Sequence, residues 1–300
     1  MPLHLTPRRT FLLRAALAGA ALFATRHLPA AEAGASTRWA LLSDTHIGPR
    51  EDAVVRGTNM AEHLRASIRE VLAAKASLAG VFINGDCALK AGLAEEYATF
   101  VPMIRPLTDA GLPLHMTLGN HDDRAHFWQA LNVSGGAARP VQNKHVSVVQ
   151  SPQANWFLLD SLDLVDKTPG RLEPAQLGWL AKALDAHQDR PALVMVHHNP
   201  HLDPARQNTG LVDTSELFDV LLPRRQVKAL FYGHSHQWNV QEKSGLHLVN
   251  LPAVAYHFAK EQPTGWVDCH LRHDGATLEL RAHDEQHPGH GKKTALKWRA

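Results

Sequence analysis

The stretch "LFYGHSHQW", residues 230–238, places two histidines directly behind an apolar run. Residues 230–232 are typical of the end of a buried strand, and "GHSH" follows at 233–236. A turn that carries two solvated imidazoles is one interpretation. The other is that the strand delivers two metal ligands to one place, since imidazole is a common metal ligand. The rest of the chain favours the second interpretation.

Four other apolar runs are also followed by polar residues. "RWALLS" leads to Asp44, "GVFIN" to Asp86, "LPLHMTL" to Asn120 and "ALVMV" to His197. Residues 59–76, 93–110, 174–188 and 213–223 have the periodicity of amphipathic helices. Strands that alternate with helices predict an α/β domain with parallel pairing.

In open α/β sheets, ligands gather in the crevice beyond the carboxyl ends of the strands. We therefore expect the polar residues at the five strand ends to share one crevice. A single histidine at a strand end is more often a hydrogen-bonded core residue than a ligand, but a series in this order is a strong signal. The predicted set is Asp44, His46, Asp86, Asn120, His197, His234 and His236.

The C-terminal part of the chain no longer alternates strands with helices. "HLVNLPAVAYHFA", "GWVDCHL" and "TLELRA" read as short strands without intervening helices, which predicts a second sheet or an antiparallel extension. Residues 283–300 are polar and are expected to form a flexible tail. The predicted folded domain is therefore residues 36–282.

Residues 1–35 resemble a twin-arginine export signal. Arg8 and Arg9 are paired, residues 15–25 form an apolar run, and small residues that suit cleavage follow near Ala33 or Ala35. The run is too short and too rich in alanine to span a bilayer. This resemblance implies a periplasmic or secreted protein without stable membrane insertion after cleavage. The alternative is an N-terminal helix that stays attached.

Composition and charge argue against a protein that binds nucleic acid. The chain is 44% hydrophobic and 20% charged, as expected for a soluble globular domain. Without residues 1–33, which hold four arginines and one glutamate, it has 27 basic and 28 acidic residues, a net charge of −1. A nearly neutral domain has no electrostatic basis for binding nucleic acid. A homo-oligomer is left open.

Cysteine usage is low. The chain has only Cys87 and Cys269. A single disulfide would be compatible with an oxidising compartment. Export of an already folded chain from a reducing cytoplasm instead favours two unpaired, buried thiols.

The polar blocks resemble those of the calcineurin-like metallophosphoesterases. They are "DTH" at 44, "GD" at 85, "GNHD" at 119, "HH" at 197 and "GHSH" at 233. "GLAEEYATFVPMI" and "GRLEPAQLGWLAKAL" are most similar to the branch of class III cyclic-nucleotide and glycerophosphodiester phosphodiesterases. The resemblance implies an α/β fold, a β-sandwich of two mixed sheets flanked by helices in four αββα layers.

The resemblance also implies a site for two metal ions. Asp44, His46 and His236 would hold one ion. Asn120, His197 and His234 would hold the other, with Asp86 bridging both. Residues two apart on an extended backbone point to the same side. Asp44 and His46 can therefore share an ion, and His234 and His236 can straddle two ions about 3.5–4 Å apart. Ser235 would be a spacer, and Gly233 would let the backbone turn close to the ions.

Three further residues are candidates for catalysis. By resemblance His121 is the general acid, which protonates the departing alkoxide or stabilises charge on the phosphate. Asp122 could orient His121, and Arg124 could hold a substrate oxygen with its planar fork. For Asp122 and Arg124, a structural role in the turn is an equal alternative.

Oxygen and imidazole ligands without thiolate favour Mn, Fe, Zn or Co. The implied enzyme is an exported phosphoesterase that hydrolyses small phosphodiesters through a metal-bound hydroxide. A phosphomonoesterase or nucleotidase that scavenges phosphate is one alternative. A non-catalytic scaffold on the same fold is another, although scaffolds of this kind tend to lose ligands that this chain keeps.

Overall fold

Strand β1, Thr37–Ser43, shows how the sequence builds two cores at once. Successive side chains of a strand point to opposite faces of its sheet. Trp39 and Leu41 pack into the core between the two sheets, whereas Ala40 and Leu42 pack against helices. The strand is therefore apolar on both faces, as expected for a strand covered on both sides.

The computed structural model describes residues 36–132, 139–201 and 203–300. The predicted export signal, residues 1–35, lies outside the described residues. Among the described residues, no helix is long and apolar enough to cross a membrane.

The first sheet has six strands in the order β14-β13-β12-β1-β4-β5. Strands β1, β4 and β5 pair in parallel, while β12, β13 and β14 extend the sheet in antiparallel fashion. The further bounds are Gly80–Asn84 for β4, Leu114–Thr117 for β5, Gly265–Arg272 for β12, Gly275–Ala282 for β13 and Lys293–Lys297 for β14.

The second sheet also has six strands, in the order β10-β11-β9-β8-β7-β6. Its central strands are parallel and its two edge strands are antiparallel. The bounds are Ser147–Gln150 for β6, Asn155–Leu158 for β7, Ala192–Met195 for β8, Val227–Tyr232 for β9, Asn239–Lys243 for β10 and Leu246–Asn250 for β11. A separate hairpin joins β2, Val54–Val55, to β3, Thr58–Asn59.

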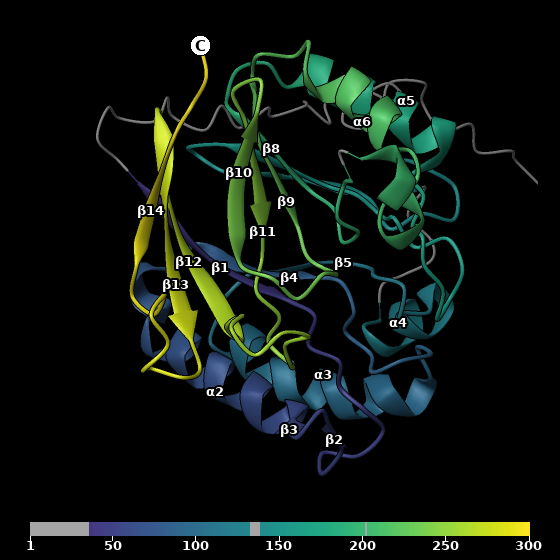
Figure 1. Ribbon diagram of the computed structural model, residues 1–300, viewed down its shortest axis with the longest axis vertical. Helices are drawn as coiled ribbons and strands as arrows, with labels where there is room; N and C mark the ends of the chain where they lie inside the picture. The colour runs from purple at the N-terminus through teal and green to yellow at the C-terminus, as the bar shows by residue number, and fades with distance from the viewer. Residues whose placement is uncertain (1–35, 133–138, 202) are drawn as a thin grey trace, which may run out of the picture. The chain divides into compact units, whose positions relative to one another are not determined.

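Helices cover the outer face of each sheet (Figure 1). Helices α2, Met60–Ala73, α3, Ala94–Asp109, and α4, Arg124–Ala130, pack on the first sheet. Helices α5, Glu173–Ala186, and α6, Thr214–Leu221, pack on the second. Two short 3₁₀ turns, η1 at Lys75–Ser77 and η2 at Pro204–Thr209, complete the elements. The predicted four-layer αββα sandwich is confirmed.

Aromatic rings fill the space between the two sheets. The ring centroids of Phe82 and Trp156 lie 4.6 Å apart, and those of Trp156 and Phe231 lie 5.1 Å apart. These rings come from β4, β7 and β9, so they join the two sheets. A densely packed seam of this kind fixes the strand ends of one sheet relative to those of the other.

The prediction of a flexible tail at residues 283–300 is wrong. Residues 293–297 form β14, which pairs with β13 at the edge of the first sheet. Leu296 is 2% exposed and Trp298 is 9% exposed. An edge strand needs only one buried face, so its lysines remain in solvent and its sequence reads as polar.

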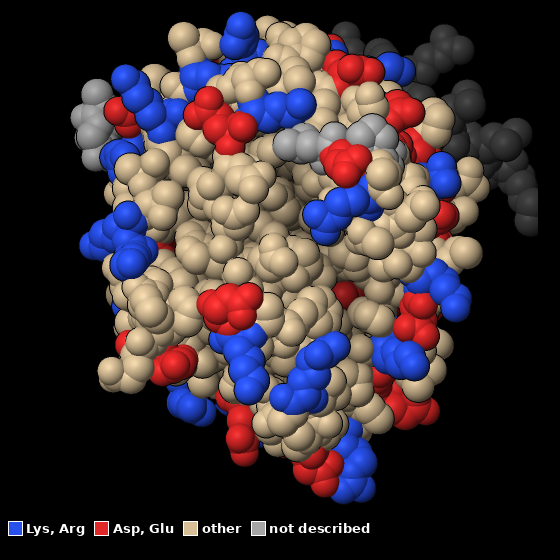
Figure 2. Space-filling model, viewed as in Figure 1, with Lys and Arg blue, Asp and Glu red and all other residues tan. Residues whose placement is uncertain are grey.

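Two further expectations concern the cysteines and the surface charge. Cys87 and Cys269 are both buried and free, as predicted. On the face shown in Figure 2, basic and acidic side chains are interspersed rather than gathered by sign. This pattern agrees with the near-neutral charge counted from the sequence.

Candidate metal centre

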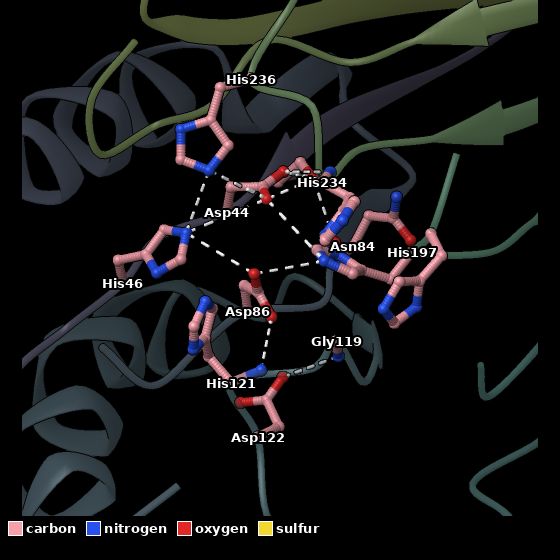
Figure 3. Close-up of polar contacts among 12 residues, drawn as sticks. Asp44, His46, Asn84, Asp86, Gly119, His121, Asp122, His197, His234 and His236 are labelled. Carbon is pink, nitrogen blue, oxygen red and sulfur yellow. Dashed lines mark hydrogen bonds and ion pairs between the residues drawn. The ribbon is translucent and has the colours of Figure 1, made fainter. Parts of the chain in front are cut away.

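The seven predicted ligands lie beyond the carboxyl ends of five strands. Figure 3 shows six of them together, and the seventh, Asn120, lines the same cavity. Six of them are buried and His234 is partly buried. They follow β1, β4 and β5 of the first sheet and β8 and β9 of the second. The set consists of Asp44 and His46 after β1, Asp86 after β4, Asn120 after β5, His197 after β8, and His234 and His236 after β9.

The ligand atoms form two adjoining groups. Asp44, His46 and His236 form one, and Asp86, His197 and His234 form the other, each with its ligand atoms within 4.8 Å of one another. Asp86 Oδ2 lies 3.6 Å from His46 Nε2 and 3.2 Å from His197 Nε2. Asp86 therefore faces both groups, as a bridging carboxylate would.

Backbone carbonyls orient the imidazoles. The Nδ1 atoms of His46, His197 and His236 contact carbonyl oxygens at 3.1, 2.9 and 2.5 Å. A carbonyl only accepts, so each Nδ1 carries a proton, and Nε2 is the atom that would bind metal when the ring is neutral. His234 is reversed: its Nε2 lies 3.2 Å from Thr209 O, which leaves Nδ1 as its ligand atom.

The backbone of the ligand loops differs from the expected extended form. Asp44, His46, Asp86, His234 and His236 all have positive φ, between 46° and 67°. The left-handed region is uncommon for residues other than glycine, and such strain clusters at functional sites. The expected extended backbone is therefore wrong, although Asp44 and His46 do converge in one ligand group.

Bonds between the loops hold this conformation. Asp44 N donates to Gly85 O at 3.1 Å and His46 N donates to Asp86 O at 2.9 Å. These bonds continue the pairing of β1 with β4 beyond the ends of both strands, so they hold the first two ligand loops together.

Gly233 has a different role from the one predicted. It is not among the positive-φ glycines, so it does not supply an unusual turn. A Cβ at this position would instead collide with Ser43 Oγ and Asp44 Oδ2. Gly233 is required because β9 passes directly against the loop that carries Asp44.

Electrostatics in the site favours ionised carboxylates. Burial would raise the pKa of Asp44, but His197 and His236 outweigh it and lower the pKa to about 2. Burial lowers the pKa of His46 to about 4. Burial and the nearby His197 together lower the pKa of His234 to about 4. Neutral imidazole and ionised carboxylate are the forms that bind metal.

His197 behaves differently. Burial would lower its pKa, but Asp86 and Asp44 raise it to about 10. A proton on this ring therefore serves as the counter-charge of the two carboxylates. A metal ion that binds here has to displace that proton, which makes metal affinity depend on pH.

The donor set fits divalent metal ions. The buried atoms Asn120 Oδ1 and His197 Nε2 have no hydrogen-bond partner among the described residues. Buried polar atoms are rarely left unpaired. Asn120 lines the cavity with His46, Asp86 and His234, and His197 Nε2 lies 3.2 Å from Asp86 Oδ2. Donors of this kind suit Mn, Fe, Zn or Co.

His121 lies at the edge of this cluster. Its Nδ1 donates to Lys90 O at 2.7 Å and lies 3.5 Å from Asp166 Oδ1. Its backbone N–H donates to Asp86 Oδ1 at 2.9 Å. The ring is partly exposed and lines the cavity, as a residue that meets substrate must. Lys90 and Asp166, rather than Asp122, orient it.

Asp122 does not reach His121 with its carboxylate. It is fully buried and accepts hydrogen bonds from the backbone of Cys87, Ala88 and Gly119 and from the hydroxyl of Tyr97. These donors belong to the loops after β4 and β5 and to α3. Of the two roles considered for Asp122, the structure supports the structural one.

Arg124 also has a structural partner, Asp160. Its Nε donates to Asp160 Oδ2 at 2.7 Å, and its Nη2 donates to Asp160 Oδ1 at 2.9 Å. The guanidinium also bonds to Leu162 O. Arg124 does not line the cavity over the metal centre. Its predicted contact with substrate is therefore replaced by a structural ion pair.

A cavity of about 380 Å³ opens over the metal centre. Its volume lies within the range of small-molecule sites, about 300–1,000 Å³. Besides the predicted residues, it is lined by Asp166, Thr168, Thr209, Tyr256 and Phe258. These five follow no strand with a recognisable motif, so sequence reasoning missed them. The only signal for any of the five in the sequence was the aromatic pair Tyr256 and Phe258 in "AYHFA".

A family model of calcineurin-like phosphoesterases matches residues 37–238. The 3',5'-cyclic adenosine monophosphate phosphodiesterase CpdA of Pseudomonas aeruginosa is 30% identical over 243 residues, which cover 78% of this chain and 82% of the relative. The protein of the same description from Haemophilus influenzae is 29% identical, over 78% of this chain and 85% of the relative.

Solved structures share the fold. A dimetal phosphatase from Danio rerio superposes with a TM-score of 0.69 at 15% identity, covering 88% of this chain and 99% of that chain. A purple acid phosphatase from yellow lupin superposes with a TM-score of 0.61 at 14% identity, covering 88% and 54%. At these identities the superpositions describe the fold alone.

Proposed function

The chain belongs to the calcineurin-like phosphoesterase family, and on this premise we propose that it hydrolyses small phosphodiesters, in particular 3',5'-cyclic nucleotides. Membership makes it a metal-dependent phosphoric ester hydrolase. The cyclic-nucleotide assignment rests on the relatives, which are cyclic-nucleotide phosphodiesterases at about 30% identity.

The observation that carries the proposal is the position of Asp86 between the two ligand groups. When bound there, metal ions would supply Lewis-acid stabilisation of the phosphoryl oxygens and of the nucleophile. Asp86 and Asp44 would supply negative charge to hold two cations in a small volume. Two carboxylates offset only part of the charge of two divalent ions, so positive charge would remain for the phosphate.

His121 handles the proton of the leaving group. With Nδ1–H held by Lys90 O, its Nε2 is free to donate a proton to the departing oxygen. Asp166 Oδ1, 3.5 Å from Nδ1, helps to hold the ring in this orientation. General acid catalysis of this kind contributes about 10²–10⁴-fold to rate.

Asp166 also supports a diester over a monoester. It lines the cavity and its side chain is 37% exposed. A carboxylate in the wall of the cavity repels a doubly charged phosphomonoester more than a singly charged phosphodiester. Lys90, with Nζ 4.0 Å from Asp166 Oδ2, reduces this effect without removing it.

The test compares two substrates that share a leaving group. Protein stripped of metal and resupplied with Mn or Zn is assayed with bis(p-nitrophenyl) phosphate and with p-nitrophenyl phosphate, and then with 3',5'-cyclic AMP. We expect metal-dependent turnover that prefers the diester and is lost in Asp86→Asn. Preference for the monoester would show a phosphomonoesterase. Inactivity toward all three substrates with metal bound would favour a scaffold.

The proposal includes export of the protein. The paired Arg8 and Arg9 before an apolar run support the twin-arginine route. Replacing both by lysine should retain the protein in the cytoplasm, whereas Arg14→Lys should not. Cell fractionation of the two variants checks this, and equal export of both would reject the route.

A further inference from the structure

Phe258 stands out on the wall of the cavity over the metal centre. Its side chain is 52% exposed, which is unusual for a phenylalanine beside a polar site. The ring stacks on His236, with centroids 4.2 Å apart and planes inclined by 19°. Phe258 therefore contacts the ligand cluster through His236, and part of its ring is exposed to solvent.

The loop that carries Phe258 is anchored to the metal centre. Val254 N donates to Ser43 O at 2.8 Å and Ala255 N donates to Asp44 O at 3.0 Å. Tyr256 O accepts from His236 Nδ1 at 2.5 Å. The position of the Phe258 ring is thus tied to that of the ligands, and a contact made there incurs little ordering entropy.

Arg56 reaches the same ring from the β2–β3 hairpin. Arg56 and Gly57 form its two-residue turn, with φ of 52° and 81°, as a type I′ turn requires. The Arg56 guanidinium carbon lies 5.1 Å from the centroid of Phe258. In the described part of the chain Arg56 is exposed and forms no ion pair, so its charge is engaged by the Phe258 ring and not by a carboxylate.

We propose that Phe258 and Arg56 recognise the nucleobase of the substrate, with the base packed against the exposed surface of the Phe258 ring. This inference rests on the proposed function, because the phosphate has to lie at the metal centre. An aromatic ring offers stacking to any planar base, and an arginine adds cation–π attraction. The pair selects nucleoside phosphodiesters over diesters that lack an aromatic group, without reading the identity of the base.

The test uses two ligands that differ only by a base, AMP and ribose 5-phosphate. Their binding to the full-length, Mn-loaded protein is measured by calorimetry, independently of hydrolysis. We expect AMP to bind the wild type more tightly. Phe258→Ala should weaken AMP binding about 5- to 100-fold and leave ribose 5-phosphate unchanged. Phe258→Trp should retain AMP binding, and Arg56→Gln should weaken it about 2- to 5-fold.

Leu93→Ala is the matched control. Leu93 is 47% exposed and does not line the cavity, so this variant should bind both ligands as the wild type does. Equal wild-type affinity for the two ligands would overturn the inference, as would equal weakening of both by Phe258→Ala. A protein that binds AMP through Phe258 but hydrolyses no ester would instead reject the proposed function and leave the base site standing.

Discussion

His46 Nε2 and His236 Nε2 lie 3.1 Å apart, although the two residues are 190 positions apart in the chain. Each ring donates its Nδ1 proton to a backbone carbonyl, Leu89 O for His46 and Tyr256 O for His236. In their neutral forms, the two rings therefore direct their Nε2 lone pairs at each other in a buried site. A cation that both nitrogens can bind converts this repulsion into attraction.

Metal should stabilise the fold. Mn or Zn at about 100 times its dissociation constant should raise the free energy of unfolding by about 2.7 kcal/mol. His236→Gln should remove most of this gain because it takes one ligand from the first group. Chemical denaturation with and without chelator measures it. His270→Gln, on a β12 residue that is 38% exposed, is the control and should keep the full gain. An equal gain in both variants would contradict the assignment.

His121→Gln should lower kcat by about 10²–10⁴-fold and leave the bound metal unchanged. A general acid matters most when the leaving group is a poor one. The loss should therefore be larger for a cyclic nucleotide than for bis(p-nitrophenyl) phosphate. Steady-state kinetics with both substrates and metal analysis of the purified variant check this. Loss of metal would instead make His121 a ligand, since its ring also lies near His46 and Asp86.

Arg124→Gln should destabilise the fold without affecting substrate binding. Its partner Asp160 is fully buried, and removing one member of a buried ion pair costs about 3–5 kcal/mol. We expect about 3 kcal/mol because Arg124 itself is 21% exposed. Arg224→Gln, which breaks a bidentate pair with the exposed Asp185, should cost at most about 1 kcal/mol. A raised KM in Arg124→Gln would restore its predicted role in binding substrate.

His283 should make the protein sensitive to acid. Burial, reinforced by His63, lowers its pKa from 6.5 to about 3. Between these values the unfolded chain binds the additional proton. The free energy of unfolding therefore falls as pH drops below 6.5, by about 1.4 kcal/mol per pH unit. Denaturation at pH 4, 5 and 6 should show a shallower slope in His283→Gln than in the wild type. His273→Gln, at an exposed position, should keep the wild-type slope.

The sequence by itself determined the strands and helices that carry the site and where the candidate metal ligands lie. Apolar runs of strand length, separated by helical periodicity, predicted the strands that carry the site, such as β1 and β9. Each ligand follows such a run directly. Because the strand ends converge in this architecture, local patterns were enough to place Asp86 and His197 together.

Only the tertiary structure decided how the remaining residues act. Whether Arg124 meets substrate depends on Asp160, which lies 36 positions away, and no local pattern records that distance. The left-handed conformation of Asp44 depends on loops of both sheets closing against each other. Phe258 reaches the cavity because its loop bonds to the backbone beside Asp44. Contacts between distant segments form only once the two sheets have packed, and for this reason the sequence could not reveal them.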